Sequence, residues 1–215
     1  DTLIGGAGDD TLDSAGHLDD QPNEAMGRGH DLLVGGAGNG GLDGGGGSDT
    51  LNGGLGNDWM SGNDAHFNPS ADTYVFDVEA GTANADFFDF YHQEDTLELH
   101  ASAMPALGAG GRFAVDDVRF HAAAGATGGH DADDRVVYNT TTRELFYDAD
   151  GGGAGAAQLI ATLAAGSTIQ AGDIVVAGSG TGGGQLINGT AGNDTLIGGD
   201  GNDTINGFAG NDSLN

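Results

Sequence analysis

A nine-residue pattern constrains the fold of this chain more than any other feature of its sequence. In its consensus, glycines occupy positions one, two and four, aspartate occupies position six, and an apolar residue occupies position eight. Copies begin at residues 5, 26, 35, 44, 53, 180, 189, 198 and 207, and a looser copy ends at Val75. The first four residues match positions six to nine. Because the chain begins and ends within such copies, we expect it to be part of a longer protein.

Each position of the pattern has a structural role. The glycines permit positive φ angles, so the first six residues can form a tight turn and the last three a short strand. Alternate strand side chains face opposite sides, so one apolar residue per strand points inward. Two copies make one coil, and residues 18 apart stack on the same edge. The predicted inward residues are Leu3, Leu12, Leu33, Leu42, Leu51, Met60, Tyr74, Ile187, Leu196, Ile205 and Leu214.

The stacking of coils also places aspartates over one another, as with Asp31 over Asp49 and Asp194 over Asp212. Such carboxylates repel one another unless a cation lies between them. Calcium takes roughly six to eight oxygen ligands, including backbone carbonyls of the kind that a glycine-rich turn exposes. Magnesium needs near-ideal octahedral geometry and retains its waters, so we expect calcium, with about four to six ions along the repeats.

Composition excludes several classes of function. Asp plus Glu number 33 and Lys plus Arg 5, which gives a formal net charge of −28. A chain of this charge will not bind nucleic acid or an anionic membrane surface. Cysteine is absent, so disulfides and thiolate metal sites are impossible, and no apolar run approaches the ~18 residues of a membrane span. The 44 glycines and high charge are also typical of disorder, but their regular spacing argues for an ordered fold.

The repeats resemble the RTX (hemolysin-type) calcium-binding repeats of secreted bacterial proteins. This resemblance covers roughly half of the chain and implies a right-handed parallel β-roll, with each ion between successive turns on one edge. It further implies that each ion is bound by two successive turns. The first turn contributes the backbone oxygens at positions two and four and its aspartate, and the second contributes the backbone oxygens at positions one and three and its aspartate. The implied ligands are Gly6, Gly8, Asp10, Gly27, Gly29, Asp31, Gly35, Ala37, Gly44, Gly45, Gly46, Gly47, Asp49, Gly53, Leu55, Asp58, Asp72, Thr181, Gly183, Gln185, Thr190, Gly192, Asp194, Gly198, Asp200, Asp203, Gly207, Ala209 and Asp212.

Some copies depart from the pattern. Gly40 stands where an aspartate is expected, so the edge that contains Asp10 and Asp58 should have weaker sites. Gln185 replaces another aspartate and offers an uncharged amide oxygen. Residues 14–25 form an insertion within one turn, and residues 62–71 extend another. We expect both to bulge from the roll, with carboxylates that either face solvent or add ligands.

The segment between the two arrays has a different composition, with most of the aromatic residues of the chain. Short alternating apolar runs predict strands at 73–78, 86–90, 95–99, 117–121, 135–138, 144–148, 158–163 and 173–176. Residues 136–147 have the pattern of a β-hairpin, and the only helical candidate is a turn around residues 101–107. The stretches 86–99 and 147–151 resemble the C-terminal domain of serralysin-type proteases and the R-modules of alginate epimerases.

These features predict an all-β fold in three parts. Residues 1–76 form a parallel β-roll, residues 77–179 form a β-rich cap over the open hydrophobic end of the roll, and residues 180–215 form a second, short β-roll. An EF-hand reading of the Asp148–Gly151 stretch fails, because Leu159 stands where the loop needs glutamate. For the acidic run of Asp131, Asp133 and Asp134, we favour a solvated loop over a binding site.

No catalytic constellation stands out. The H-E-x-x-H and G-x-S-x-G motifs are absent, the seven histidines are scattered with no i, i+4 pair, and a chain without lysine has no P-loop. We therefore expect no enzyme in this chain. The resemblance implies a calcium-dependent folding module of a type I secreted protein. The alternative is a structural or adhesive segment of an RTX adhesin or S-layer-like assembly, which self-associates or binds a surface ligand. Both imply an extracellular or cell-surface location.

Overall fold

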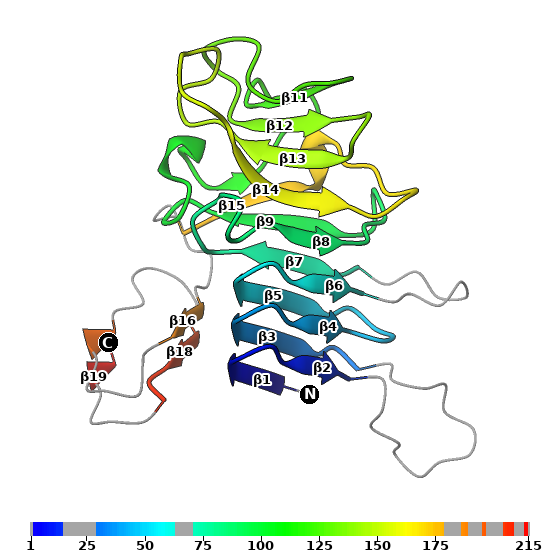
Figure 1. Cartoon of the computed structure of the whole chain (residues 1–215), viewed down its shortest axis with the longest axis vertical. Coiled ribbons are helices and arrows are strands. Elements are labelled where there is room, and N and C mark those ends of the chain that lie inside the picture. Colours follow the sequence, from blue (N-terminus) through cyan, green and yellow to red (C-terminus); the bar gives the residue numbers. More distant parts are fainter. Residues whose placement is uncertain are drawn as a thin grey trace.

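The computed structural model describes residues 2–14, 29–62, 71–178, 186–188, 195–196, 204–208 and 213–214. Over these residues the fold is all-β, as predicted, with strands stacked from one end of the molecule to the other (Figure 1). Two short 3-10 helices interrupt the strands, η1 (Pro105–Leu107) within the predicted helical turn and η2 (Ala171–Asp173), which was not predicted. No helix among these residues is long and apolar enough to cross a membrane.

Two large sheets form the body of the molecule. The seven-stranded sheet contains, in spatial order, β1 (Thr2–Ala7), β3 (Leu32–Ala37), β5 (Thr50–Leu55), β7 (Thr73–Phe76), β9 (Thr96–His100), β15 (Ile174–Ala177) and β10 (Gly111–Arg112). The eight-stranded sheet contains β11 (Phe120–Ala123), β12 (Val136–Asn139), β13 (Glu144–Tyr147), β14 (Gln158–Leu163), β8 (Asp86–Phe88), β6 (Trp59–Ser61), β4 (Gly41–Asp43) and β2 (Thr11–Asp13). The chain alternates between the two sheets from β1 to β9, which is the parallel β-roll that the repeats predict.

The register of the strands confirms that two repeats make one coil. Leu33 on β3 pairs with Leu51 on β5, and Leu42 on β4 pairs with Met60 on β6, in each case 18 residues apart and parallel. Leu3 pairs with Leu33, so the register of the apolar residues is the same before and after the insertion at 14–25.

The roll geometry continues past residue 76. Strand β8 pairs in parallel with β6, and β9 pairs in parallel with β7, so both sheets extend without interruption into the segment that differs in composition. The division of the chain at residues 76 and 179 therefore stays a prediction, while the sheets themselves run across residue 76.

Beyond β9 the sheets become mixed. Strands β12 and β13 form the predicted antiparallel hairpin, with Val137 opposite Phe146. Strand β14 then joins this hairpin to the roll by pairing antiparallel with β13 and parallel with β8. On the other sheet, β15 pairs in parallel with β9.

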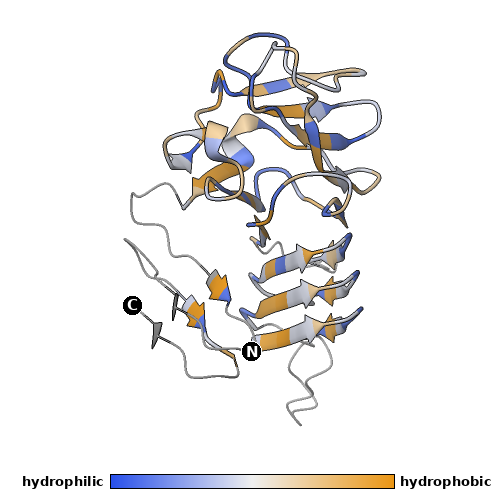
Figure 2. Cartoon of the chain, turned by 60° about the vertical axis from the view of Figure 1, so that its left-hand side comes forward, coloured by the Kyte–Doolittle hydropathy of each residue, from blue (hydrophilic) through white to orange (hydrophobic). Residues whose placement is uncertain are grey.

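A continuous hydrophobic core lies between the two sheets. Leu33, Leu42, Leu51, Met60 and Tyr74, which the pattern predicts to point inward, have no exposed side-chain surface. The core continues through the aromatic rings of Tyr74, Phe76, Phe88 and Phe90, whose neighbouring centroids lie 4.9 to 6.0 Å apart. Met104, Leu107 and Phe113 join the same core. Hydrophobic residues thus recur along the strands of both large sheets (Figure 2), and the role of residues 77–179 as a cap stays a prediction.

The C-terminal repeats form two further parallel pairs. Strand β16 (Leu186–Asn188) pairs with β18 (Thr204–Asn206), and β17 (Thr195–Leu196) pairs with β19 (Ser213–Leu214). Both pairs have the 18-residue register of the first roll, with Ile187 opposite Ile205. Among the described residues these strands belong to neither large sheet, and the second, short β-roll at 180–215 stays a prediction.

Candidate calcium-binding edges

Two rows of turns follow opposite edges of the roll. The first edge is defined by the turns that end at Asp31, Asp49, Asp72 and Asp95, directly before the strands β3, β5, β7 and β9. The second edge is defined by the turns that end at Asp10, Gly40 and Asp58, directly before β2, β4 and β6, and at Asp86, the first residue of β8. Because the repeats fix position six at the end of each turn, the sequence stacks these residues in two columns.

On the first edge the aspartates form an unbroken column. The backbone N–H of Asp31 donates to Oδ1 of Asp49 at 2.9 Å, and the N–H of Asp49 donates to Oδ1 of Asp72 at 2.8 Å. The N–H of Asp72 then donates to Oδ1 of Asp95 at 3.0 Å. All four residues are buried, with Asp49 and Asp72 only 1% exposed. The carboxylates of Asp49, Asp72 and Asp95 therefore each bridge their own turn and the one before it.

On the second edge the column is interrupted. The N–H of Asp58 donates to Oδ1 of Asp86 at 2.9 Å, and the N–H of Gly40 donates to Oδ1 of Asp58 at 2.6 Å. Gly40 has no carboxylate to offer to the turn of Asp10. At this point the turns are connected by the N–H of Gly41, which donates to the Asp10 carbonyl at 2.9 Å, and by the N–H of Asn39, which donates to Oδ1 of Asp9 at 2.8 Å. The prediction of weaker sites on this edge rests on that missing side chain.

The second oxygen of each aspartate points into its own turn. An ideal Cβ on Gly44 would lie 2.6 Å from Oδ2 of Asp49, and one on Gly53 would lie 2.6 Å from Oδ2 of Asp58. Position one must therefore be glycine for the turn to close on the carboxylate. Oδ2 of Asp10 and Oδ2 of Asp58 are buried and accept no hydrogen bond from the described residues. Burying a carboxylate oxygen without a donor is costly, so a cation fits this position.

Backbone carbonyls complete the oxygen-rich surroundings. Gly36 and Gly38 have φ angles of +101° and +129°, which glycine adopts without strain. A Cβ at Gly36 would collide with the carbonyl oxygen of Gly6, and one at Gly38 would collide with that of Gly8. The carbonyls at positions two and four thus face the next turn of the same edge. Carboxylate and carbonyl oxygens together are the hard donors that calcium prefers.

Burial of these carboxylates without a cation disfavours their charged form. Burial raises the pKa of Asp86 to about 8; a hydrogen bond from the backbone of Asp58 opposes this shift, and the charges of Asp58 and Asp77 add to it. Burial likewise raises the pKa of Asp58, against a hydrogen bond from Gly40 and with a contribution from the charge of Asp9. The second edge therefore holds carboxyl groups that a bound cation would return to the ionised form.

The structure brings together many of the residues implied as ligands. On the two edges it describes Gly6, Gly8, Asp10, Gly29, Asp31, Gly35, Ala37, Gly44, Gly45, Gly46, Gly47, Asp49, Gly53, Leu55, Asp58 and Asp72, and it describes Gly207 after β18. The rest lie outside the described residues: Gly27, Thr181, Gly183, Gln185, Thr190, Gly192, Asp194, Gly198, Asp200, Asp203, Ala209 and Asp212. Of the predicted bulges at 14–25 and 62–71, residues 15–25 and 63–70 also lie outside the described residues.

Sequence reasoning missed two members of the columns, Asp86 and Asp95. Both follow the frame of nine, since residues 81–89 and 90–98 place aspartate at position six and a buried apolar residue, Phe88 or Leu97, at position eight. Only Gly81 remains of the glycines that mark the other copies. The signal was therefore the spacing of aspartate and apolar residues rather than the glycines.

Comparison with known families agrees with this geometry. Residues 1–16, 27–42, 43–66 and 179–214 match the family model of the RTX calcium-binding nonapeptide repeat in four copies. A search of the curated proteins found no match to the chain. The chain therefore contains RTX calcium-binding nonapeptide repeats over these residues, and this family of repeats binds calcium ions. The repeat is a structural calcium-binding module.

Proposed function

We propose that the chain is a calcium-dependent folding module of a larger secreted bacterial protein, exported through a type I channel and folded outside the cell. The observation that carries this proposal is the column of buried aspartates on the first edge, Asp31, Asp49, Asp72 and Asp95. A chain of net charge −28 repels itself when calcium is scarce. Cations between the turns offset this repulsion, and their binding free energy becomes folding free energy.

The proposed ions lie between successive turns of each edge. On the first edge they lie between Asp31 and Asp49, between Asp49 and Asp72, and between Asp72 and Asp95, each with carbonyls of the two turns. On the second edge the best site lies between Asp58 and Asp86, because both turns contribute a carboxylate there. Extracellular calcium modules bind with Kd values of about 10⁻⁴–10⁻³ M, so single ions contribute modestly and the stack contributes cooperatively.

A calcium titration of the full chain tests this proposal. With saturating calcium, small-angle scattering should give a compact particle, near the ~17 Å radius of gyration of a folded chain of this length, and circular dichroism should show strands. In chelator the radius should rise towards the ~50 Å of an unfolded chain. Magnesium at the same concentration serves as the control and should leave the chain expanded. A protein that stays compact in chelator would contradict the proposal.

A structural or adhesive segment is the second candidate, and an exposed aromatic pair favours it. Trp59 on β6 and Phe87 on β8 are neighbours in register on the eight-stranded sheet, and they are 46% and 42% exposed. Exposed aromatic residues side by side are typical of contact surfaces. If this surface mediates self-association, analytical ultracentrifugation in calcium should detect oligomers, and the double variant Trp59→Ser with Phe87→Ser should be monomeric. A wild-type chain that stays monomeric at all concentrations would remove this form of the second candidate.

A further inference from the structure

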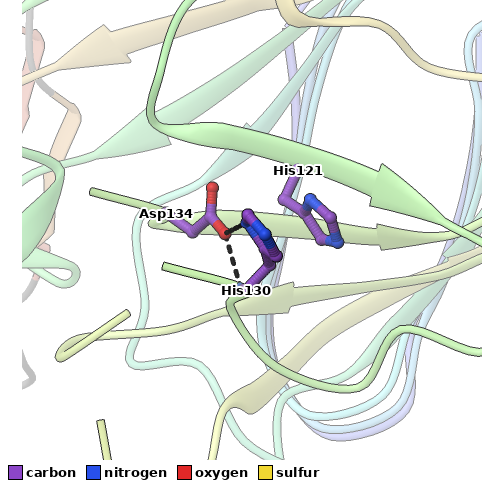
Figure 3. A group of neighbouring side chains, drawn as sticks. All are labelled: His121, His130 and Asp134. Carbon is purple, nitrogen blue, oxygen red and sulfur yellow. Dashed lines mark hydrogen bonds and ion pairs between the residues drawn. The ribbon is translucent and has the colours of Figure 1, made fainter. Parts of the chain in front are cut away.

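Three side chains outside the calcium-binding edges converge at the far end of the eight-stranded sheet. His121 lies on the edge strand β11, and His130 and Asp134 lie in the connection from β11 to β12. One ligand atom from each lies within 4.8 Å of the others. The two imidazole rings are stacked, with centroids 5.3 Å apart and planes 14° apart. Figure 3 shows the ring of His130 between the ring of His121 and the carboxylate of Asp134.

Asp134 holds this arrangement in place. Its Oδ2 accepts the backbone N–H of His130 at 2.6 Å and that of Asp131 at 3.0 Å, so the connection folds around the carboxylate. Asp134 is only 4% exposed, whereas Asp131 and Asp133 are exposed. The expectation of a solvated acidic loop was therefore wrong for Asp134, because its side chain satisfies two backbone donors.

Other described histidines have simpler surroundings. His92 Nδ1 lies 2.7 Å from Oδ2 of Asp173, and His100 Nε2 lies 2.9 Å from Oε1 of Glu98. Each of these rings has one carboxylate partner, as expected of a structural ion pair or hydrogen bond. Among the described residues, only one group combines two histidines with a carboxylate whose ligand atoms lie this close together.

We propose that His121, His130 and Asp134 form a site for a transition-metal dication of the zinc type, separate from the calcium edges. Imidazole nitrogens with a carboxylate oxygen suit zinc, copper or nickel, whereas calcium takes oxygen ligands. At metal–ligand distances of about 2.0–2.2 Å, tetrahedral ligands lie about 3.4 Å from one another, so the outermost pair of ligand atoms must close by at most about 1.4 Å. The side chain of His130 is 70% exposed and supplies this movement, while the buried Asp134 stays fixed.

The site opens into a hollow in the surface of about 480 Å³. Val115 and Val118 line this hollow together with His121, His130 and the exposed Asp133. Three protein ligands leave a fourth zinc position for water or a small ligand, as in open zinc sites. The hollow provides room at this position, and the surrounding carboxylates favour a cation over an anion. The site therefore takes a metal ion with one exchangeable position.

Zinc titration of the full chain in saturating calcium, followed by calorimetry, tests this proposal. The wild-type chain should bind zinc in addition to calcium. His130→Ala and His121→Ala should each weaken the zinc affinity by more than about tenfold, which is the least expected when a direct ligand is lost. Asp134→Asn retains an oxygen acceptor for the two backbone donors but removes the charged ligand, so it should weaken zinc without unfolding the loop.

His30→Ala is the matched control. His30 is also exposed, and its Nδ1 lies 2.9 Å from a backbone carbonyl oxygen, that of Ser48, outside the cluster. Its substitution should leave zinc binding unchanged, and none of the cluster variants should change the calcium concentration for half-folding. Wild-type zinc affinity in both His121→Ala and His130→Ala, no zinc binding by the wild-type chain, or an equal loss in His30→Ala would each overturn the proposal. If His121→Ala does not fold, the zinc affinity of His130→Ala alone decides, because His130 is exposed and its substitution should not affect folding.

Discussion

The two edges of the roll have the same turns but different columns of carboxylates. On the first edge Asp49 has a carboxylate neighbour on both sides, Asp31 and Asp72, whereas on the second edge Asp58 has one neighbour, Asp86, and faces Gly40 on the other side. The backbone hydrogen bond from Gly40 to Asp58 nevertheless forms. The conformation of a turn therefore does not depend on its aspartate ligand, because glycine at position six preserves the turn and removes only the carboxylate.

The largest predicted effect is on folding stability in calcium, when one central carboxylate is removed from either edge. Asp49→Ala removes a ligand from two proposed ions, and each ion contributes about 1.4 kcal/mol when calcium exceeds its Kd about tenfold. We expect a loss of about 3 kcal/mol for Asp49→Ala and about half of that for Asp58→Ala, which has one carboxylate neighbour. Calcium titrations of folding by circular dichroism measure both.

The control for this pair is Asp116→Ala. Asp116 is exposed and lies outside both columns. Its neighbour Asp117 is unsuitable, because the guanidinium of Arg119 donates to it at 2.8 Å and lowers its pKa to about 2. Equal calcium midpoints for Asp49→Ala and Asp116→Ala would mean that calcium does not hold the first edge.

Restoring the missing carboxylate should make the second edge bind calcium more like the first. Gly40→Asp supplies a ligand between Asp10 and Asp58, so it should lower the calcium concentration for half-folding. A Cβ at Gly40 would lie 3.0 Å from the Asp10 carbonyl oxygen, so some adjustment of the turn is required. Gly40→Ala introduces the same Cβ without a carboxylate and isolates this steric cost.

Without calcium, the Gly40→Asp substitution should destabilise the fold. A third carboxylate beside Asp10 and Asp58 adds repulsion, so calcium-free Gly40→Asp should be less stable than calcium-free Gly40→Ala. Thermal melts of both variants with and without calcium give the comparison. If Gly40→Asp binds calcium no better than Gly40→Ala, then position six does not supply a ligand on this edge.

A smaller predicted effect is a dependence of the stability of the calcium-free protein on pH, which arises from the second edge. In the calcium-free fold, burial raises the pKa of Asp86 to about 8 and raises that of Asp58, so the folded chain holds protons that the unfolded chain has lost. The stability from these protons is complete below the ordinary aspartate pKa and is lost as the pH rises through the folded pKa. Calcium-free protein should therefore be more stable at about pH 5 than at about pH 8.

Calcium should reverse this dependence, because it binds the ionised carboxylates. Thermal melts across the pH range check both signs, and Asp86→Asn should flatten the calcium-free profile. A calcium-free protein that gains stability from pH 5 to pH 8, or an unchanged profile in Asp86→Asn, would contradict the assignment of raised pKa values to this edge.

Local spacing made the roll predictable. The frame of nine predicted the inward residues and the 18-residue register, because each strand needs only one apolar residue and each turn only its glycines and aspartate. The β12–β13 hairpin was predictable for the same reason, since its strands are adjacent in sequence. These features depend on interactions between neighbouring segments.

Features that depend on distant packing were not predictable in this way. Asp86 and Asp95 continue the columns in turns without most of the glycines, where packing against the preceding coil replaces the local turn signal. His121 and His130 show no metal-ligand spacing along the chain, and the two rings stack because the connection after β11 folds back towards that strand. Asp86 and Asp95 keep only the spacing of aspartate and apolar residues, whereas the two histidines are brought together by the fold alone.

A crystal structure of the chain grown in calcium, with anomalous scattering used to identify the ions, tests the central claim most directly. We predict ions between Asp31 and Asp49 and between Asp49 and Asp72, and a weaker or missing ion at the turn of Gly40. An ordered roll with no ion between the turns of Asp31 and Asp49 would contradict the account.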